Sequence, residues 1–360
     1  MGSSRPQPFS KEFPLVSIPK KVVVLPDAGP KNPFQYQLVA YLEGCGLDVR
    51  KAPSRRFGAV VSAVFRHRPD VLYFDWVQSF ILGKTLLVTL LRCLVFVLEI
   101  SYVTYIRRIP VVHTLHNVQN HAKRWLRLER TVYGWFLRRC DKIRVYSETT
   151  RRKIARFYKL DPGRILVIQD VPYHHYYPNQ VSRREGRTEL GIPDDAVVFL
   201  FLGLVKPYKG LEDLIAAFLR LEGEATYLVI AGASDQQSYG ESLRRQVAGH
   251  PRIVYHNFFI DPGKVQYYYQ AADAVVLPFK NVEHSGSVDL ALSFGKPVIT
   301  VNTPLLNGLL AHQRELLFNH PGELPGCLAA APRFDLAAIG KANFRVVDGA
   351  NYKNLILLFR

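Results

Sequence analysis

Two glycines and two lysines in one short loop form the clearest candidate for a ligand site in this sequence. The apolar run 199–202 ends at Gly203, Lys206 and Lys209 follow, and Gly210 opens the next segment. Glycine lets a backbone approach a ligand closely, and the start of a helix offers free N–H groups with partial positive charge. Two ammonium groups beside such N–H groups predict a diphosphate site. The same residues also fit an ordinary strand, turn and helix with solvated lysines.

A second polar loop follows another apolar run further along the chain. Glu283 and His284 lie in this loop, and Ser285-Gly286-Ser287 comes directly afterwards. Serine is a preferred N-cap residue, and a helix that starts near Gly286 could hold further phosphate oxygens with its N–H groups. A carboxylate accepts hydrogen bonds from hydroxyl groups, so Glu283 is the candidate for contacts with a sugar.

The two loops need elements that hold them, and the apolar pattern predicts alternating strands and helices. A helix is expected after Gly210, with Leu211, Leu214, Ile215 and Phe218 on its buried face. In the first half, buried strands are expected at 21–25, 70–74, 110–114 and 142–147, and a helix at about 33–43. Strands that alternate with helices form parallel, doubly wound sheets, in which ligands bind at the carboxyl ends of the strands.

In these motifs the sequence resembles the C-terminal half of GT-B glycosyltransferases of the family 4 type, which include bacterial exopolysaccharide and lipid-linked oligosaccharide assembly enzymes. The loop at 203–210, the loop at 283–287 and the run from Gly295 to Ile299 carry the resemblance, which covers about 197–302. It implies an α/β fold of the GT-B class, with two Rossmann-like, doubly wound parallel-sheet domains that face a cleft.

The resemblance also implies roles for individual residues. Glu283 would be a catalytic carboxylate that orients the donor sugar. The donor, a nucleotide diphosphate sugar, would be bound by Gly203, Lys206, Lys209, Gly210, Phe259, Ile260, Ser285, Gly286, Ser287 and Gly29. Fixed positive charge would stabilise the leaving diphosphate, so neither a metal nor another cofactor is expected. The backbone at 258–260 would recognise the base.

Two positions depart from the family pattern. Leu204 stands where an arginine usually follows the first glycine, and Lys206 is the nearest replacement for its charge. The family's paired glutamates would each fall one position away from Glu283 and Asp289. A glycosyltransferase is still expected despite these two departures. They leave open whether the product forms with retention of configuration at the transferred sugar.

Polar residues after two predicted strands of the first half are candidates for the acceptor site. His113, His116 and Asn117 lie at the end of the strand at 110–114, and Asp75 and Trp76 follow the strand at 70–74. In the resembling family a histidine at this strand end lies near the donor sugar and the acceptor. His116 is therefore the second catalytic candidate, a base if the enzyme inverts, and the other four are expected to contact the acceptor or sugar.

Other interpretations of these residues remain open. Each histidine could be a core residue bonded to the backbone, and Gly29, in the loop after the first strand, could mark a plain turn. The spacing of His113, His116 and His121 does not place all three on one face, and no carboxylate completes a set of ligands. No metal site is therefore expected.

Length and composition fit two domains. With 360 residues, 48% of them hydrophobic, the chain is too long for one ordinary core. We expect an N-terminal acceptor-side domain at 1–178, a polar linker at 179–195 and a nucleotide-sugar domain at 196–335. A helical segment is expected at 336–360, and in GT-B proteins such a segment crosses back onto the N-terminal domain. Four scattered cysteines and a polar N-terminus predict a reducing compartment and no signal peptide, and hence a cytoplasmic location.

Positive charge is concentrated in one segment, which begins at Arg107 and ends at Leu160 and is called the basic segment. It holds fifteen Lys or Arg and three acids, in a chain with a formal net charge of +17. Aromatic and apolar residues interleave with the bases, which favours docking on an anionic membrane surface. A solvated helix face remains a second interpretation. A nucleic-acid groove is the least favoured, because no motif of a nucleic-acid-binding fold accompanies the bases.

The stretch from Thr85 to Ile106 is long and apolar enough to be a membrane span by composition. Its only charged residues are Arg92 and Glu99. Each would cost about 2.5–3.5 kcal/mol at the centre of a bilayer, and the stretch separates two strands that are expected in one sheet. It is therefore predicted to be a buried or membrane-touching helix.

These features predict a glycosyltransferase that moves a sugar from a nucleotide diphosphate sugar to a hydroxyl of a lipid-linked or polysaccharide acceptor, peripherally bound at the cytoplasmic face of the cell membrane. A GT-B-like sugar-phosphate epimerase or phosphorylase would use a similar phosphate site, although no segment marks a lysine for pyridoxal phosphate. A non-enzymatic membrane or nucleic-acid binding protein would explain the charge but not Glu283 and its neighbours.

Overall fold

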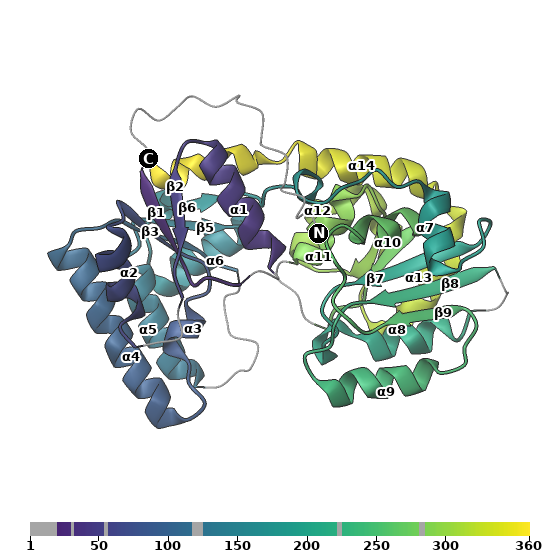
Figure 1. Ribbon diagram of the computed structural model, residues 1–360, viewed down its shortest axis with the longest axis horizontal. Coiled ribbons are helices and arrows are strands. Elements are labelled where there is room, and N and C mark those ends of the chain that lie inside the picture. Colours follow the sequence, from purple (N-terminus) through teal and green to yellow (C-terminus); the bar gives the residue numbers. More distant parts are fainter. Residues whose placement is uncertain (1–19, 30–31, 54–56, 117–124, 222–224, 281–284) are drawn as a thin grey trace. The chain divides into compact units, whose positions relative to one another are not determined.

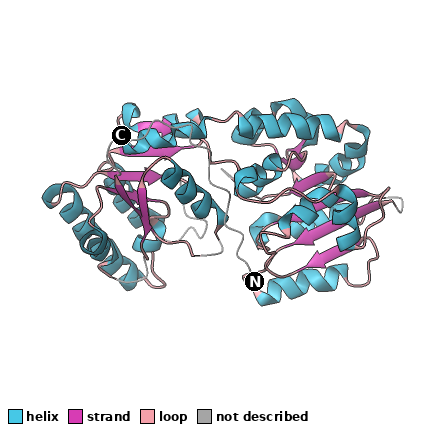
Figure 2. Cartoon of the chain, turned by 45° about the horizontal axis from the view of Figure 1, so that its top comes forward, coloured by secondary structure: helices cyan, strands magenta, loops and turns pink. Residues whose placement is uncertain are grey.

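The structure of the protein is a computed structural model, and it describes residues 20–29, 32–53, 57–116, 125–221, 225–280 and 285–360. The described chain forms two compact units, one of residues 20–171 with 351–360 and one of residues 172–350. Each unit contains a parallel sheet with flanking helices (Figures 1 and 2). The predicted α/β class with two doubly wound parallel sheets is confirmed.

The sheet of the first unit has six parallel strands in the order β2-β1-β3-β4-β5-β6. Its strands are β1 Lys21–Leu25, β2 Asp48–Lys51, β3 Val71–Phe74, β4 Val111–Thr114, β5 Lys142–Val145 and β6 Ile165–Val167. Strands β3 and β4 are buried along their whole length, as expected for a parallel sheet that is covered on both faces. The order reverses between β1 and β3, which makes the ends of these strands the expected binding edge.

The helices of the first unit begin with the predicted one at 33–43. Helix α1 starts after Asn32, whose side chain caps it by accepting a hydrogen bond from the Gln35 N–H. The helical segments are α1 Pro33–Gly44, α2 Ala59–His67, α3 Gln78–Ile81, α4 Leu86–Ser101, the π-helical turn η1 Tyr102–Ile106, α5 Leu126–Leu137, α6 Glu148–Tyr158, η2 Pro162–Arg164 and η8 Asn351–Phe359.

Helix α4 with η1 is the stretch that composition alone could assign to a membrane span. By length and composition Leu86–Ile106 could cross a membrane, and only 33% of its most apolar window is buried. However, the strands before and after it, β3 and β4, pair in parallel through Leu72 with Val111 and Phe74 with His113. In this fold α4 is therefore a crossover helix whose two ends return to one sheet.

The second unit also has six parallel strands, in the order β12-β11-β10-β7-β8-β9. The strands are β7 Val197–Leu202, β8 Thr226–Ala231, β9 Ile253–His256, β10 Ala274–Leu277, β11 Val298–Val301 and β12 Leu317–Phe318. The helical segments are η3 Tyr173–His175, α7 Arg183–Leu190, η4 Pro207–Lys209, α8 Leu211–Phe218, α9 Gln237–Val247, α10 Val265–Ala271, α11 Gly286–Ser293, α12 Pro304–Leu309, η5 Ala311–Leu316, η6 Pro321–Glu323, α13 Leu324–Ala330, η7 Ala331–Arg333 and α14 Leu336–Asp348.

Helix α8 buries the four apolar residues that the sequence pattern assigned to its inner face, Leu211, Leu214, Ile215 and Phe218. It lies directly after η4 and follows strand β7. The predicted strand, glycine turn and helix around the two lysines are therefore present.

The division between the units falls between Val171 and Pro172, whereas the sequence suggested a linker at 179–195. Much of that stretch is α7, which packs on α10 so closely that a Cβ on Gly186 would lie 2.6 Å from the Tyr267 carbonyl oxygen. At the other boundary, η8 belongs with the first unit: the Lys20 ammonium donates to the Phe359 carbonyl at 2.7 Å.

Candidate functional site

In the second unit, Gly203 lies where β7 ends. Its φ of +154° is one that residues with a side chain rarely adopt. A Cβ at this position would approach the Ser287 Oγ to 3.2 Å, and a Cβ on Gly232, after β8, would lie 1.8 Å from the Gly203 carbonyl oxygen. Glycine is therefore required at both positions for the neighbouring loops to meet.

Gly210 joins the loop after β7 to the loop after β10. It has a φ of +72°, and a Cβ on it would lie 2.0 Å from the Pro278 carbonyl oxygen. The Lys280 N–H also donates to the Tyr208 carbonyl at 3.0 Å. Two loops that are far apart in the sequence, each at the start of a helix, thus lie side by side.

Lys209 is buried in this junction, with 8% of its surface exposed. Its Nζ lies 4.4 Å from the ring centroid of Phe279 and 5.2 Å from that of Tyr208. Burial in apolar surroundings, together with the charge of Lys206, lowers the pKa of Lys209 to about 8. An anion bound beside it would favour the charged form.

Lys206 is more accessible, and it already has a charged partner. Its Nζ lies 2.9 Å from the Asp235 Oδ2. An incoming diphosphate would therefore compete with Asp235 for this ammonium group, whereas Lys209 makes no ion pair within the described residues.

Ser285, Gly286 and Ser287 form the start of α11. Ser285 is its N-cap, as predicted, and its side chain accepts a hydrogen bond from the Ser287 N–H at 3.3 Å. A Cβ on Gly286 would lie 2.9 Å from the Tyr173 hydroxyl. Glu283 and His284 lie outside the described residues, so the proposed catalytic carboxylate has no described geometry.

Phe259 and Ile260, the expected site of base recognition, follow β9. Ile260 is buried and anchors the segment, whereas Phe258 and Phe259 are exposed. The Phe258 ring stacks on His256 with their centroids 5.3 Å apart, and the Tyr268 hydroxyl bonds to His256 Nδ1 at 2.8 Å. An aromatic surface therefore lies beside the backbone that was expected to contact the base.

In the first unit, Asp75 and His116 lie together at the carboxyl ends of β3 and β4, the expected binding edge of the sheet. Asp75 Oδ1 is 3.2 Å from His116 Nε2, and the Tyr146 hydroxyl is 3.1 Å from His116 Nδ1. Trp76 stacks on the His116 ring with the centroids 4.9 Å apart and the planes at 14°. Three neighbouring strands, β3, β4 and β5, thus contribute to one cluster around an imidazole. Asn117 and His121 lie outside the described residues.

Gln35 is a member of this cluster that the sequence analysis missed. Its Nε2 donates to Asp75 Oδ2 at 3.2 Å and to the Pro26 carbonyl at 2.8 Å, while its Oε1 accepts from the Ala28 N–H at 2.9 Å. One side chain therefore ties the loop after β1 to Asp75. Gly29 turns that loop with a φ of +80°, and nothing lies within 4 Å of the position of its Cβ.

His113, which we expected to contact a sugar, is a core residue. Its Nδ1 lies 2.8 Å from the Phe74 carbonyl oxygen, and its Nε2 lies 2.7 Å from the Tyr133 hydroxyl. Burial lowers its pKa to about 3, so the ring is neutral at physiological pH. Because both ring nitrogens are occupied and buried, the structural interpretation of His113 replaces the acceptor-site one.

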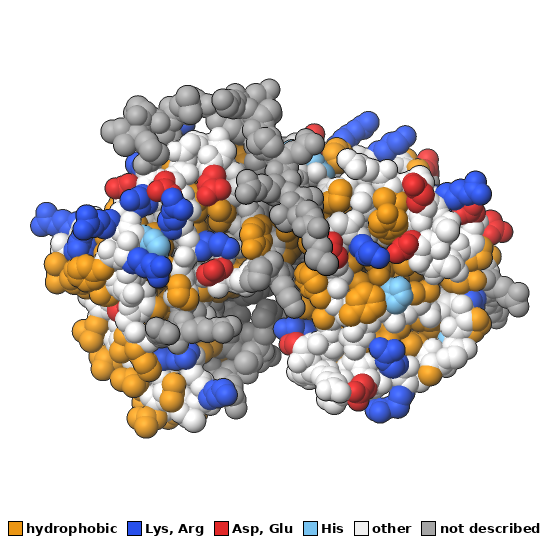
Figure 3. Space-filling model, viewed as in Figure 1, with side chains coloured by type: hydrophobic (Ala, Val, Ile, Leu, Met, Phe, Trp, Pro, Cys, Tyr) orange, Lys and Arg blue, Asp and Glu red, His pale blue; other side chains and the backbone are white. Residues whose placement is uncertain are grey.

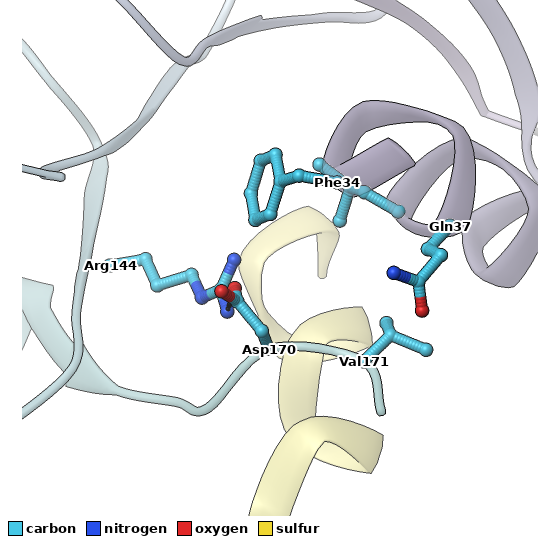
Figure 4. Close-up of a pocket in the computed structure, with 6 residues that line it drawn as sticks. Phe34, Gln37, Arg144, Asp170 and Val171 are labelled. Carbon is cyan, nitrogen blue, oxygen red and sulfur yellow. Dashed lines mark hydrogen bonds and ion pairs between the residues drawn. The ribbon is translucent and has the colours of Figure 1, made fainter. Parts of the chain in front are cut away.

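A small crevice in the same unit contains a buried ion pair that the sequence gave no signal for. Arg144 contacts Asp170 through Nη2 and Oδ1, and its Nε donates to the Ile168 carbonyl at 3.0 Å. Figure 4 shows these two side chains beside Phe34 and Gln37, which come from α1. Arg144 is one of the fifteen bases of the basic segment, but it is fully buried, and its acidic partner follows β6.

The described part of the basic segment covers β4, α5, β5 and α6. Val132, Phe136 and Leu137 of α5 are core residues, so the interleaved apolar residues partly face inward. Several bases lie on the outside of the two helices: Arg127, Arg130, Arg138, Arg152, Lys153, Arg156 and Lys159. The exposed surface of these helices is therefore mainly basic, and Glu148 and Phe157 of α6 are exposed beside the bases.

Two family profiles match the chain. Residues 21–170 match the family described as "Glycosyltransferase Family 4", and residues 182–321 match the one described as "Glycosyl transferases group 1". Together the two matches cover both sheets.

Curated relatives are similar over part of their length. The chain is 27% identical over 234 residues to a GDP-mannose:glycolipid 4-beta-D-mannosyltransferase of Xanthomonas campestris pv. campestris, covering 64% of this chain and 61% of the relative. It is 30% identical over 213 residues to a D-inositol 3-phosphate glycosyltransferase of Corynebacterium efficiens, covering 53% of this chain and 49% of the relative. The chain thus matches less than two thirds of the length of either relative.

Solved structures show the same fold over almost the whole chain. Anabaena Alr3699/HepE, in complex with UDP and glucose, superposes with a TM-score of 0.72 at 16% identity and covers 94% of this chain and 99% of its own. The sucrose-phosphate synthase of Thermosynechococcus elongatus superposes with a TM-score of 0.69 at 16% identity, over 95% of this chain and 97% of its own.

Proposed function

We propose, from the premise that this chain belongs to the GT-B glycosyltransferases of the family 4 type, that it transfers a sugar from a nucleotide diphosphate sugar to a hydroxyl of a lipid-linked or polysaccharide acceptor. The observation that carries the proposal is the contact between the loops after β7 and β10. It places Lys209 and the starts of α8 and α11 in one region, as a diphosphate site requires.

The chemistry assigned to this region is stabilisation of a leaving group. In the transfer, the acceptor oxygen bonds to the anomeric carbon, the bond from that carbon to the diphosphate breaks, and its electron pair leaves with the nucleoside diphosphate. Lys209, Lys206 and the backbone N–H groups near Gly203 and Ser287 would stabilise the developing negative charge without a metal. Glu283 would orient the donor sugar.

The acceptor hydroxyl loses a proton in this reaction, and His116 is the candidate to receive it if the enzyme inverts. Asp75 would hold the imidazole in one orientation, and Trp76 would pack on its face, as the distances of 3.2 Å and 4.9 Å indicate. The stacked rings of Trp76 and His116 are also suited to packing against the apolar face of a sugar.

The substrate classes are supported by what similar proteins are named for. The Xanthomonas relative acts on a glycolipid, and the Anabaena neighbour was crystallised with UDP and glucose. We propose a lipid-linked acceptor on the cytoplasmic face of the cell membrane, in exopolysaccharide biosynthesis, with the basic segment at the anionic surface.

Incubation with a panel of nucleotide sugars tests the proposal. The full-length protein should hydrolyse one donor slowly without an acceptor, and addition of a matching glycolipid should accelerate its consumption. A Lys209→Met variant, tested in parallel, should lose most of the hydrolysis. The proposed activity would be contradicted if no donor in the panel were turned over and the protein also bound no nucleoside diphosphate.

A further inference from the structure

The outer face of α4 and η1 is apolar and uncovered. Leu87 is 77% exposed, Leu98 is 61% exposed and Ile106 is 71% exposed, and Leu91 and Leu94 between them are also exposed. Their spacing of three to four residues places Leu87, Leu91, Leu94 and Leu98 along one side of the helix. Figure 3 shows hydrophobic side chains gathered at the lower left, where Figure 1 places α4. A continuous apolar surface of this kind indicates a partner.

Both charged residues of α4 are turned toward the protein. Arg92 Nη1 donates to the Leu82 carbonyl at 2.7 Å and to the Ser79 carbonyl at 3.3 Å. Glu99 is buried, and its Oε1 accepts a hydrogen bond from the Val61 N–H at 2.9 Å. The two charges that argued against a membrane span therefore do not interrupt the exposed apolar face.

The rim of this face consists of aromatic rings and arginines in contact. Phe65 of α2 stacks on Tyr102, with the centroids 6.2 Å apart, and the Arg107 guanidinium lies 5.8 Å from the Phe65 centroid. Arg139 lies 3.7 Å from the Trp135 centroid and 5.5 Å from that of Tyr105. Side chains with an apolar body and a charged or polar tip are those that occupy the boundary between lipid and water.

We propose that the outer face of α4 and η1 enters the interface of an anionic lipid bilayer, with the helix lying in the plane of the membrane. The inference rests on the proposed function in one respect: an enzyme with a lipid-linked acceptor must reach the membrane surface. The helix does not cross the membrane, because β3 and β4 return both of its ends to one sheet. The contact combines burial of leucine side chains with attraction of the rim arginines to lipid phosphates.

Charge decides between lipid and a second copy of the chain as the occupant. Lys84 lies exposed before the apolar face, and Arg107 and Arg108 lie exposed after it. Two copies that paired through this face, in either direction, would bring cations against cations. Anionic headgroups complement both ends of the face at once.

Vesicle sedimentation with paired variants tests the inference. The test variant is Leu87→Gln with Leu94→Gln, and its matched control is Leu219→Gln with Leu357→Gln, which changes two exposed leucines elsewhere. On vesicles with anionic lipid, the test variant should bind at least tenfold more weakly than the unaltered protein, and the control should bind equally well. The loss should persist at high salt, where Arg107→Gln with Arg108→Gln no longer makes a difference.

The opposite outcomes are equally defined. Equal binding of the test and control variants would overturn the inference. The inference would also be overturned if the unaltered protein did not bind vesicles and instead formed a dimer that dissociates in the test variant. The face would then be an interface between copies of the chain. Circular dichroism and thermal unfolding of both variants show that the leucine changes leave the fold intact. Donor turnover on a soluble acceptor is measured separately, so loss of the proposed activity and loss of lipid binding are distinguishable.

Discussion

Lys209 is the residue on which the donor site depends most directly. It is the buried cation at the junction of the two loops, whereas Lys206 already pairs with Asp235 at 2.9 Å. Lys209→Met should weaken binding of a nucleoside diphosphate by about 1.5–3 kcal/mol, the cost of one charge-assisted contact. Lys206→Met should cost less, since that ammonium must first leave Asp235. Calorimetry with a nucleoside diphosphate checks which variant loses more affinity. An unchanged affinity in Lys209→Met would show that the diphosphate does not bind at this loop.

The lowered pKa of Lys209 also makes a prediction about stability. Between pH 8 and 10.5 the unfolded chain keeps a proton on this lysine that the folded chain has lost. The free energy of unfolding contributed by this group should therefore rise with pH across that window, by at most ~3 kcal/mol. Urea unfolding at pH 8 and pH 10 should show the rise in the unaltered protein and less of it in Lys209→Met. The same slope in both would indicate that the amine is not buried.

His113 should affect stability on the acid side. Its folded pKa of about 3 lies below its ordinary value of 6.5, so the unfolded chain binds a proton first as the pH falls. Stability from this group is present above pH 6.5 and is lost as the pH falls toward 3. His113→Gln should flatten the acid side of a stability profile, whereas His116→Gln should lower activity. The reverse pattern would exchange the roles of the two histidines.

Glu283 is assigned to the sugar and not to the phosphates, and kinetics can separate the two. Glu283→Gln keeps the shape of the side chain, so turnover should fall by tenfold or more while nucleoside diphosphate affinity changes little. Asp289→Asn, in the first turn of α11, is the matched control. If Asp289→Asn is the damaging change instead, the acid that matters lies inside the helix.

The sequence could place candidate residues at strand ends, but it could not decide which of them point into the site. His113 lies in strand β4 and His116 follows it two residues after the strand ends. Their neighbours come from other elements: Phe74 and Tyr133 for His113, and Asp75 and Tyr146 for His116. The glycine turn at Gly203 and the N-cap at Ser285, by contrast, were predictable, because glycine and a serine N-cap are local signals. The contact between the two loops was not predicted, because it joins segments that are far apart in the sequence.

At the scale of elements, Gly210 fixes how the donor loops meet. Gly210→Ala must accept both a φ of +72° and a contact of 2.0 Å with the Pro278 carbonyl oxygen. Gly191→Ala has a comparable φ of +67° with nothing within 4 Å, so it should cost only about 1–2 kcal/mol of stability. Gly210→Ala should cost about 1–3 kcal/mol more and should also weaken nucleotide binding. Equal losses of stability in the two variants, with nucleotide binding unchanged, would show that the contact between the two loops is not needed for either property.

At the scale of the whole molecule, the sequence predicted two parallel sheets because buried strands and helices are regular and local. It could not predict the boundary, because α7 is polar like a linker and yet packs on α10 through Gly186. Nor could it assign the surface charge, since Arg144 becomes buried only through Asp170, which lies beyond the next strand.

The exposed bases of α5 remain available to a membrane. Arg127→Gln with Arg130→Gln should weaken binding to anionic vesicles by about 1 kcal/mol per arginine, and the effect should shrink as salt is raised. Arg244→Gln with Arg245→Gln, an adjacent exposed pair on α9, is the control. Binding of a labelled oligonucleotide, weakened by the α5 variant, would favour a nucleic-acid groove, and absence of binding to either would favour a solvated face.

The return of η8 to the first unit has a consequence for biosynthesis. Lys142 donates to the carbonyl oxygens of Leu357 and Arg360, and the Tyr41 hydroxyl donates to the Lys353 carbonyl at 3.2 Å. These partners leave the ribosome only after all of residues 172–350. The unit that is translated first must therefore wait, with part of its surface uncovered, until the unit that is translated second has been synthesised.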